Sequence, residues 1–209
     1  MMSASASTQP AWPKIILASQ SPRRKQLLAE AGYSFEVLAS GIKEPPPRPN
    51  ESPAAYAMRL AYLKAAAVAG RVSQGLVVGC DTVVESEGAI FGTPVDRDDA
   101  RRILTALRGK LHRVITGVCL WDVATGRATV RYASTLLRMD HLSDAQLEEY
   151  LDSNEWQGKA GAFGYQDRLG WVHIVEGSES NVVGLPLELL AEMLCQMWKE
   201  LSDGNSAGQ

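Results

Sequence analysis

Residues 76–84 place the tightest limit on the fold, because they read Leu-Val-Val-Gly-Cys-Asp-Thr-Val-Val. A run of β-branched and apolar side chains with one acid predicts a buried central strand with polar residues near its end. An ionised carboxylate is costly to bury unless it is paired or bound to a metal. Asp81 is therefore predicted to be a metal ligand or a general base. The alternative is a strand-end residue that caps a turn.

Strands and helices alternate around this run. The chain opens with an apolar strand at 14–18 and a helix at 23–31, which Ser21 caps. This alternation, followed by a hairpin around Gly126, predicts an α/β fold with a mixed β-sheet and flanking helices. Further strands are expected at 35–38, 90–91, 112–121, 127–137, 162–165 and 171–175, and further helices at 53–69, 96–107, 144–151 and 187–198.

The length of 209 residues suits one domain or two tightly joined lobes. We expect one folded domain over 14–201, with flexible tails at 1–13 and 202–209. A hydrophobic share of 45% and a charged share of 22% are ordinary globular values, so a disordered or fibrous protein is excluded.

The net charge of −3 argues against a protein that coats nucleic acid. A small nucleotide held by a few local cations is the better expectation. No basic segment precedes an apolar run at the start, and no run is long enough to span a membrane. Cys80, Cys119 and Cys195 are odd in number and far apart, so we expect buried, reduced thiols in the cytoplasm.

The segment Ser19-Gln20-Ser21-Pro22-Arg23-Arg24 lies at the start of the first helix. Helix N-termini bind anions, and arginines and serine hydroxyls add donors that match phosphate. The alternative is a capped helix with two solvated arginines. Neither a Walker-type phosphate loop nor the Gly-rich dinucleotide fingerprint is present, which argues against a dinucleotide-binding domain.

Three other positions are candidates for binding. Glu44 lies in a proline-stiffened loop, which suits a metal ligand, and Lys64 lies on a predicted helix with few other charges. Gln166 follows a Gly-rich segment and could contact a base edge. A solvated lysine and a tight glycine turn are the plainer alternatives. His112 and His173 do not cluster with each other and are expected to be structural.

Taken together and in this order, these segments resemble the Maf family of nucleoside triphosphate pyrophosphatases. The resemblance covers residues from about 15 to about 194. The segments that carry it are Leu-Ala-Ser-Gln-Ser-Pro-Arg-Arg at 17–24, Arg-Leu-Ala at 59–61 with Lys-Ala at 64–65, Asp-Thr-Val-Val at 81–84, His-Arg-Val-Ile-Thr-Gly at 112–117, Lys-Ala-Gly-Ala-Phe at 159–163 with Gln166, and Asn-Val-Val-Gly-Leu-Pro-Leu at 181–187.

The resemblance implies two lobes around a deep cleft, a homodimer, and cleavage between the α- and β-phosphates of a nucleotide. It implies that Asp81 accepts a proton and that Glu44 and Asp81 hold Mg²⁺ or Mn²⁺. Arg23, Arg24 and Lys64 would neutralise the triphosphate with help from Ser19, and substrate preference would fall to Arg23, Thr82 and Gln166. This combination resembles the branch that acts on dTTP and UTP.

One departure from the family pattern lies at Gly92-Thr93-Pro94, where the family usually carries a lysine that contacts the substrate. Thr93 supplies no charge, so either another cation substitutes or affinity and base preference differ. Two alternatives follow: hydrolysis of other or modified nucleotides, and a nucleotide-binding regulator of division-septum formation with little or no catalysis.

Overall fold

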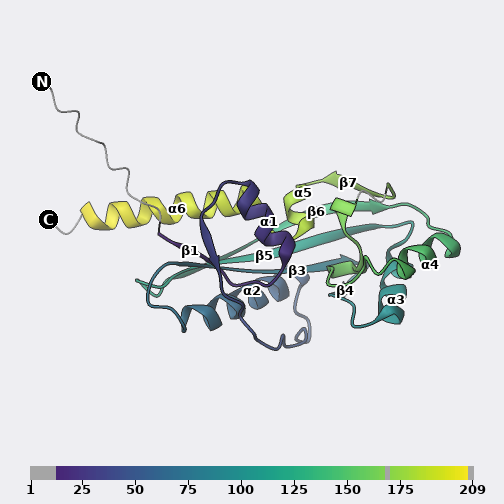
Figure 1. Ribbon diagram of the computed structural model, residues 1–209, viewed down its shortest axis with the longest axis horizontal. Coiled ribbons are helices and arrows are strands. Elements are labelled where there is room, and N and C mark those ends of the chain that lie inside the picture. Colours follow the sequence, from purple (N-terminus) through teal and green to yellow (C-terminus); the bar gives the residue numbers. More distant parts are fainter. Residues whose placement is uncertain (1–12, 168–169, 207–209) are drawn as a thin grey trace, which may run out of the picture.

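The computed structural model describes residues 13–167 and 170–206, and within them one mixed sheet runs the length of the molecule (Figure 1). The strand order is β2-β1-β3-β5-β6-β7, and β4 pairs with β3 beside this path. The strands are β1 (Ile15–Leu17), β2 (Phe35–Val37), β3 (Leu76–Ser86), β4 (Ala89–Phe91), β5 (Leu111–Asp122), β6 (Ala128–Met139) and β7 (Val172–Glu176).

The sheet is mixed, as expected. β1 runs parallel to β2 and β3, whereas β3, β5, β6 and β7 pair antiparallel in turn. Six helices accompany the strands in the described residues: α1 (Pro22–Glu30), α2 (Pro53–Ala69), α3 (Arg97–Leu107), α4 (Asp144–Asp152), α5 (Glu179–Val183) and α6 (Leu187–Ser206). The α/β prediction with flanking helices is confirmed.

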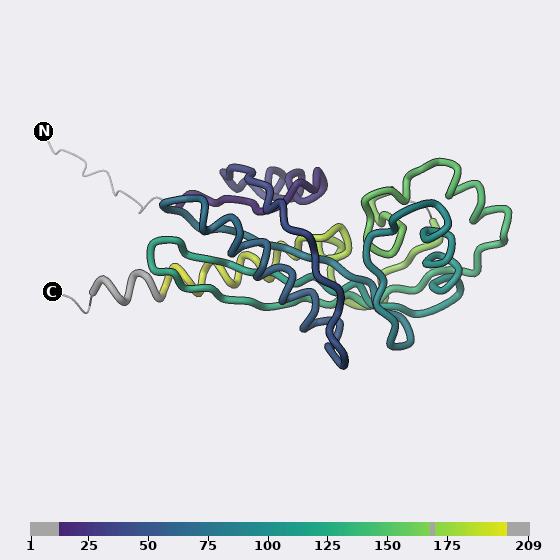
Figure 2. The backbone as a smooth tube through the Cα atoms, turned by 90° about the horizontal axis from the view of Figure 1, so that it is seen from below, coloured from purple at the N-terminus to yellow at the C-terminus, as the bar shows by residue number. Residues whose placement is uncertain are grey.

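The long strands β3, β5 and β6 pass through two lobes (Figure 2). In the first lobe α2 covers one face of the sheet and α1 with α6 covers the other, around a core that includes Leu28, Val78 and Leu190. In the second lobe α3, α4 and the segment after α4 surround a separate core that includes Leu104 and Phe163.

Two glycines let α2 lie unusually close to the sheet. A Cβ on Gly79 would be 2.3 Å from the carbonyl oxygen of Ala61, and one on Gly117 would be 2.4 Å from that of Ala57. Gly117 is also the residue paired with Asp81 across β5 and β3. The absence of side chains at these two positions lets the α2 backbone pack directly on β3 and β5 beside Asp81.

Three elements differ from the sequence-based expectations. The strand expected at 162–165 is wrong: the chain forms 3-10 turns at Ala160–Ala162 and Tyr165–Asp167. Gly161 and Ala162 have φ values of 75° and 64°, in the left-handed region and outside the extended region of a regular strand. The short helix α5 was not expected, and α6 continues to Ser206, into the stretch expected as a tail. The expected N-terminal tail lies outside the described residues except for Pro13.

The cysteines divide into two kinds. Cys80 and Cys119 are buried, and burial raises the pKa of the Cys80 thiol to about 11 and that of Cys119 to about 12. Cys195 is exposed, so the expectation of three buried thiols is wrong. Met193 and Leu194 face the core from the same turn of α6, which leaves Cys195 on the solvent side of this amphipathic helix. In the described part of the chain, no helix is both long and apolar enough to cross a membrane.

Candidate active site

A cleft opens where β3 lacks a neighbouring strand on one side. β1 pairs with Leu76, Val77 and Val78, and β4 pairs only with residues from Val84 onward. Asp81 and Thr82 lie in the gap between these partners, bonded to β5 on the other side. Asp81 was expected near a strand end, but it lies inside an eleven-residue strand. The strand that ends next to the site is β1, whose last residue, Leu17, pairs with Val78 of β3.

Asp81 forms an ion pair with Lys64 of α2. The Lys64 Nζ lies 2.6 Å from Asp81 Oδ1 and 2.6 Å from Glu44 Oε1, so one ammonium joins both carboxylates. The side chains of Asp81 and Lys64 are 7% and 12% exposed, whereas that of Glu44 is 49% exposed. Burial raises the pKa of Asp81, and the nearby charge of Lys64 opposes this rise. Asp81 therefore caps no turn, and Lys64 is not a solvated lysine.

The loop that carries Glu44 is held by α2. The hydroxyl of Tyr56 donates to the carbonyl of Pro45 at 3.2 Å. Arg59 donates to the carbonyl of Pro46 at 3.1 Å and to both carboxylate oxygens of Glu51 at 2.7 Å. These contacts extend the stiffness expected from the prolines and place Glu44 beside Asp81. Tyr56 also lines the cleft, and the sequence analysis did not single it out.

The other face of β3 presents Thr82 to Arg24. The Arg24 guanidinium donates to Thr82 Oγ1 at 3.0 Å, to the Gly184 carbonyl at 2.7 Å and to Ser19 Oγ at 3.2 Å. The Ser21 hydroxyl caps α1, as expected. Ser19 is buried behind Arg24 and does not line the main pocket; its direct contact with a substrate stays a prediction.

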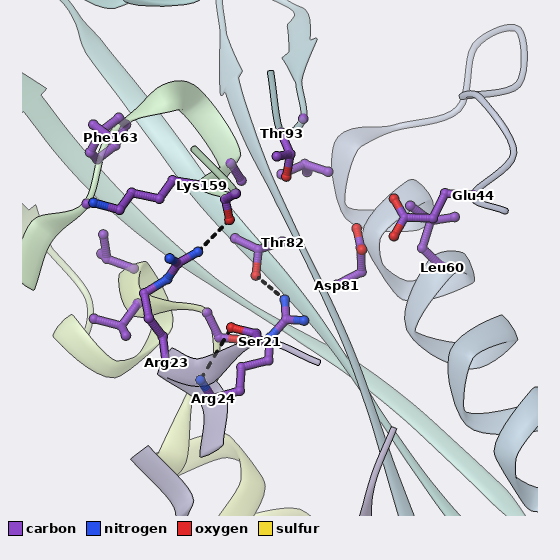
Figure 3. A pocket seen from close by; sticks show the side chains of 18 of the residues that line it. Ser21, Arg23, Arg24, Glu44, Leu60, Asp81, Thr82, Thr93, Lys159 and Phe163 are labelled. Atoms are coloured by element: carbon purple, nitrogen blue, oxygen red, sulfur yellow. Dashed lines mark hydrogen bonds between the residues drawn. The ribbon is translucent and has the colours of Figure 1, made fainter. Parts of the chain in front are cut away.

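Arg23 reaches from the first lobe to the second. Its Nη2 donates to the carbonyl of Gly158 at 2.6 Å, across the mouth of the cleft (Figure 3). Burial and the charge of Arg24 lower the pKa of Arg23, and Asp167 acts in the opposite direction. The guanidinium remains charged at any physiological pH because its ordinary pKa is so high.

The second lobe contributes Gln166, Thr93 and an unpredicted cation, Lys159. The Lys159 ammonium pairs with the carboxylate of Asp167, and both side chains are largely buried. In Figure 3 the Lys159 side chain points away from Asp81, so it does not replace the charge that Thr93 lacks. Lys159 was not among the predicted site residues because it lies in a Gly-rich segment. A lysine and an acid that flank this segment, Lys159 and Asp167, were the only local indication of the pair.

The two structural histidines lie outside the pocket. Burial lowers the pKa of His112 to about 4, so its ring is neutral at pH 7, and it packs edge-on against Phe163 with ring centroids 5.4 Å apart. His173 pairs with Asp140 at 2.8 Å. Both contacts fit the structural roles expected for them.

Predicted site residues from distant parts of the chain therefore line one cavity of about 150 Å³, with the acids on one side and the arginines on the other (Figure 3). Such a cleft, in a mixed-sheet α/β protein, combines the cationic side chains that suit an anionic ligand with a buried carboxylate beside them. The predicted residues that line it are Arg23, Arg24, Glu44, Lys64, Asp81, Thr82 and Gln166.

Residues 14–197 match the family described as Maf-like protein, and the chain belongs to this family. It is 50% identical over 182 residues to the dTTP/UTP pyrophosphatase of Rhodopirellula baltica, covering 86% of this chain and 80% of that protein. It is 41% identical to the dTTP/UTP pyrophosphatase of Pelotomaculum thermopropionicum, covering 87% and 95%.

One solved structure, the Ham1 protein of Staphylococcus aureus, is 13% identical with a TM-score of 0.43, covering 60% of this chain and 71% of that one. This likeness is too weak to bear on function.

Proposed function

We propose that this protein hydrolyses dTTP and UTP to the nucleoside monophosphate and pyrophosphate. The carrying observation is the convergence of Asp81, Lys64 and Glu44 with two arginines in one cleft. Hydrolysis of a phosphoanhydride requires positioning and neutralisation of charge, and these side chains supply both. The names of the two relatives supply the base preference.

We further propose that Glu44 and Asp81 hold a divalent cation, Mg²⁺ or Mn²⁺. Both carboxylates already approach one cationic centre, the Lys64 ammonium, and hard carboxylate oxygens are the ligands these ions prefer. Among the described residues no group of three or more His, Cys, Asp or Glu side chains converges. Phosphate oxygens and water would therefore complete the shell. When bound, the cation would neutralise phosphate charge and lower the pKa of a bound water.

Asp81 would accept the proton of the attacking water as its oxygen approaches the α-phosphorus. A raised pKa suits this role, because the carboxylate must take up a proton and release it again. The charge of Lys64 favours the ionised form of Asp81 and so opposes the effect of burial. Arg23, Arg24 and Lys64 would then stabilise the pyrophosphate as it leaves. Arg23, Thr82 and Gln166 lie around the same pocket and would discriminate among bases.

A nucleotide panel with pyrophosphate detection tests this function directly. We expect release of pyrophosphate from dTTP and UTP in Mg²⁺ or Mn²⁺ and none in EDTA. Release of orthophosphate would contradict cleavage between the α- and β-phosphates. Equal rates for purine and pyrimidine triphosphates would contradict the proposed preference.

Thr93 favours a second candidate. It lines the pocket without a charge, and Lys159, the additional cation there, is engaged with Asp167. The phosphate charge of ordinary triphosphates would then be less well neutralised during cleavage. The protein would act on modified nucleotides, or it would bind nucleotides as a division regulator without hydrolysing them. Tight nucleotide binding without pyrophosphate release would favour the regulator. Thr93→Lys should then increase affinity for UTP.

We also propose a homodimer in the cytoplasm. The homodimer is implied by the resemblance to the family, and two buried free thiols suit a reducing compartment. The absence of a basic surplus argues against nucleic acid as a partner. Light scattering after size-exclusion chromatography measures the oligomeric state directly, and a monomeric mass would contradict it.

A further inference from the structure

Two of the family-like segments, at 112–117 and 181–187, each contain a buried polar residue that the proposed function does not use. Thr116 and Asn181 are both fully buried, and neither lines the pocket. Both lie directly behind Thr82 and Arg24. Thr116 Oγ1 is 3.0 Å from Thr82 Oγ1 and 3.2 Å from the backbone carbonyl oxygen of Asn181.

The chemistry of these groups fixes the direction of each hydrogen bond. A carbonyl oxygen can only accept, so Thr116 donates its single hydroxyl proton to Asn181. Thr116 must then accept from Thr82, which uses the single proton of Thr82. Thr82 is left as an acceptor for Arg24, which donates to it at 3.0 Å. One consistent chain of hydrogen bonds therefore runs from the Asn181 carbonyl through Thr116 and Thr82 to the Arg24 guanidinium.

Both ends of this arrangement are carried by α5 and its cap. The side-chain amide of Asn181 donates to the Val114 carbonyl at 3.0 Å and to Thr135 Oγ1 at 2.9 Å, which fixes α5 on strands β5 and β6. Gly184 ends the helix with φ of 113°, and its carbonyl accepts from Arg24 Nε at 2.7 Å. The Asn181 carbonyl thus orients the Thr116 hydroxyl, and the Gly184 carbonyl orients the Arg24 guanidinium.

We propose that Thr116 and Asn181 are positioning residues that orient Thr82 and, through it, Arg24. An arginine has five N–H donors. Three are used by Gly184, Ser19 and Thr82, which leaves one N–H on each terminal nitrogen for an anion. The anion would be the phosphate chain of the nucleotide, so the proposal rests on the proposed function. A fixed guanidinium loses less freedom when it binds than a mobile one does.

Thr116→Val tests this arrangement, because it keeps the shape and removes the hydroxyl. We expect kcat/KM for UTP to fall roughly tenfold to a hundredfold, the scale of a misplaced binding group. The dissociation constant for inorganic pyrophosphate, measured by calorimetry, should rise in parallel. Thr116→Ser keeps the hydroxyl, so its kcat/KM and its affinity for pyrophosphate should stay close to those of the wild type. Unchanged pyrophosphate affinity in a folded Thr116→Val protein would overturn the proposal.

A matched control and a double-mutant cycle separate positioning from general damage. Ser86→Ala also removes a buried hydroxyl from β3, but that hydroxyl donates to the Leu111 carbonyl and does not line the pocket, so pyrophosphate affinity should not change. Thr116→Val should cost nothing further in a Thr82→Val background, because the effect passes through Thr82. Additive losses would contradict this path.

Two outcomes distinguish this inference from the proposed function. If wild type releases pyrophosphate from UTP but Thr116→Val does so equally well, the function stands and the positioning role fails. If wild type hydrolyses no nucleotide but Thr116→Val still weakens pyrophosphate binding, the positioning role stands without the function. Should Thr116→Val fail to fold, Thr116→Ala gives the same comparison with Thr116→Ser.

Discussion

The two lobes support their shares of the cleft in different ways. The first lobe supplies Asp81, Thr82 and Lys64 from a long strand and a long helix, packed closely through Gly79 and Gly117. The second lobe supplies Gly158, Lys159 and Gln166 from 3-10 turns and irregular chain. Regular elements fix side chains through their backbones, whereas the cleft-lining segment of the second lobe is irregular, and its Lys159 is held by an ion pair with Asp167. We therefore expect chemistry to depend on the first lobe, and positioning of the second to depend on its ion pairs.

The largest effect is expected in the first lobe. Asp81→Asn should lower kcat by about two to four orders of magnitude, because it removes the proposed proton acceptor while keeping the shape. Steady-state pyrophosphate release measures this directly. Asp122→Asn is the matched control, since Asp122 is also buried, but its carboxylate accepts from Ala124 and Thr125 in the turn after β5 and does not line the pocket. If Asp81→Asn retained near-wild-type turnover with metal present, Asp81 would have no catalytic role.

The second lobe should lose stability when its buried pair is broken. Lys159→Met leaves Asp167 without its partner, and removing one member of a buried pair costs about 3–5 kcal/mol. Urea unfolding of Lys159→Met and of Lys159→Met with Asp167→Asn measures this. The double variant should recover much of the loss, because no buried charge remains uncompensated. Equal stability of the two variants would argue against the pair as the support of this turn.

Lys64 is expected to affect how kcat/KM depends on pH. The Lys64 charge opposes the rise in the Asp81 pKa, so Lys64→Met should raise that pKa further. A base must be ionised to act, so the acid limb of kcat/KM should move to higher pH, and the loss of activity should be largest on the acid side of the profile. Arg59→Met is the control: Arg59 lies on the same helix but pairs with Glu51. A limb that moves equally in both variants would exclude a specific action of Lys64.

The same contrast explains how far the sequence could predict the site. Asp81 was recognisable because an acid within a β-branched run has few structural reasons to be there. The α1 start was recognisable from Ser21 and Pro22. Residues 162–165 were expected to form a strand, because nothing in a local pattern indicates the positive φ of Ala162.

Contacts between distant segments were beyond local patterns. Lys159 can pair with Asp167 because the chain turns between them. The Asn181 carbonyl accepts from the Thr116 hydroxyl because α5 packs on β5. The five-residue helix α5 is too short to leave a clear hydrophobic period. Asp81 was placed near a strand end because the paired length of β3 is set by β5, which follows it in the chain.

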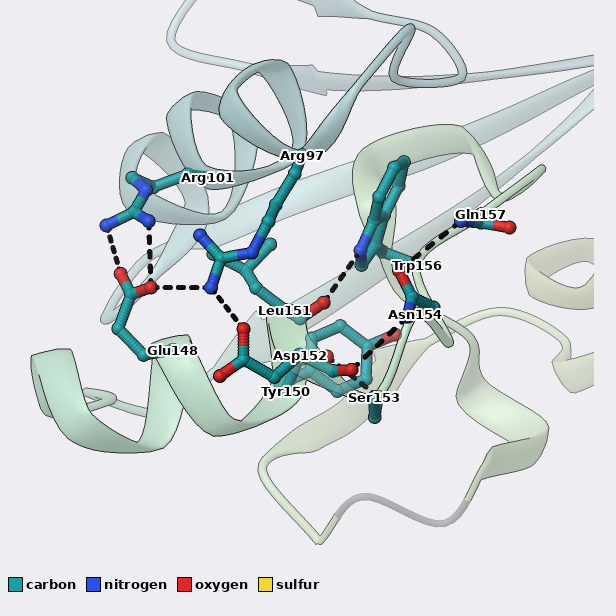
Figure 4. A network of polar contacts seen from close by, with 10 residues as sticks. All are labelled: Arg97, Arg101, Glu148, Tyr150, Leu151, Asp152, Ser153, Asn154, Trp156 and Gln157. Carbon is teal, nitrogen blue, oxygen red and sulfur yellow. Dashed lines mark hydrogen bonds and ion pairs between the residues drawn. The ribbon is translucent and has the colours of Figure 1, made fainter.

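The smallest effect is expected at the outer face of the second lobe, where α3 is joined to α4 (Figure 4). Glu148 accepts from Arg97 at 2.9 Å and pairs with both nitrogens of Arg101, and Arg97 also pairs with Asp152. All four side chains are at least about one-third exposed, so water and salt screen their charges.

Glu148→Gln should therefore cost less than about 1 kcal/mol of unfolding free energy. The KM for UTP should not change. Urea unfolding at low and high salt, together with KM, separates the possibilities. A rise in KM with little loss of stability would mean that the turns carrying Gln166 are held from outside by the α3–α4 contacts. That result would mean that the exposed ion pairs between α3 and α4, rather than the buried Lys159–Asp167 pair, hold the turns of the second lobe in place.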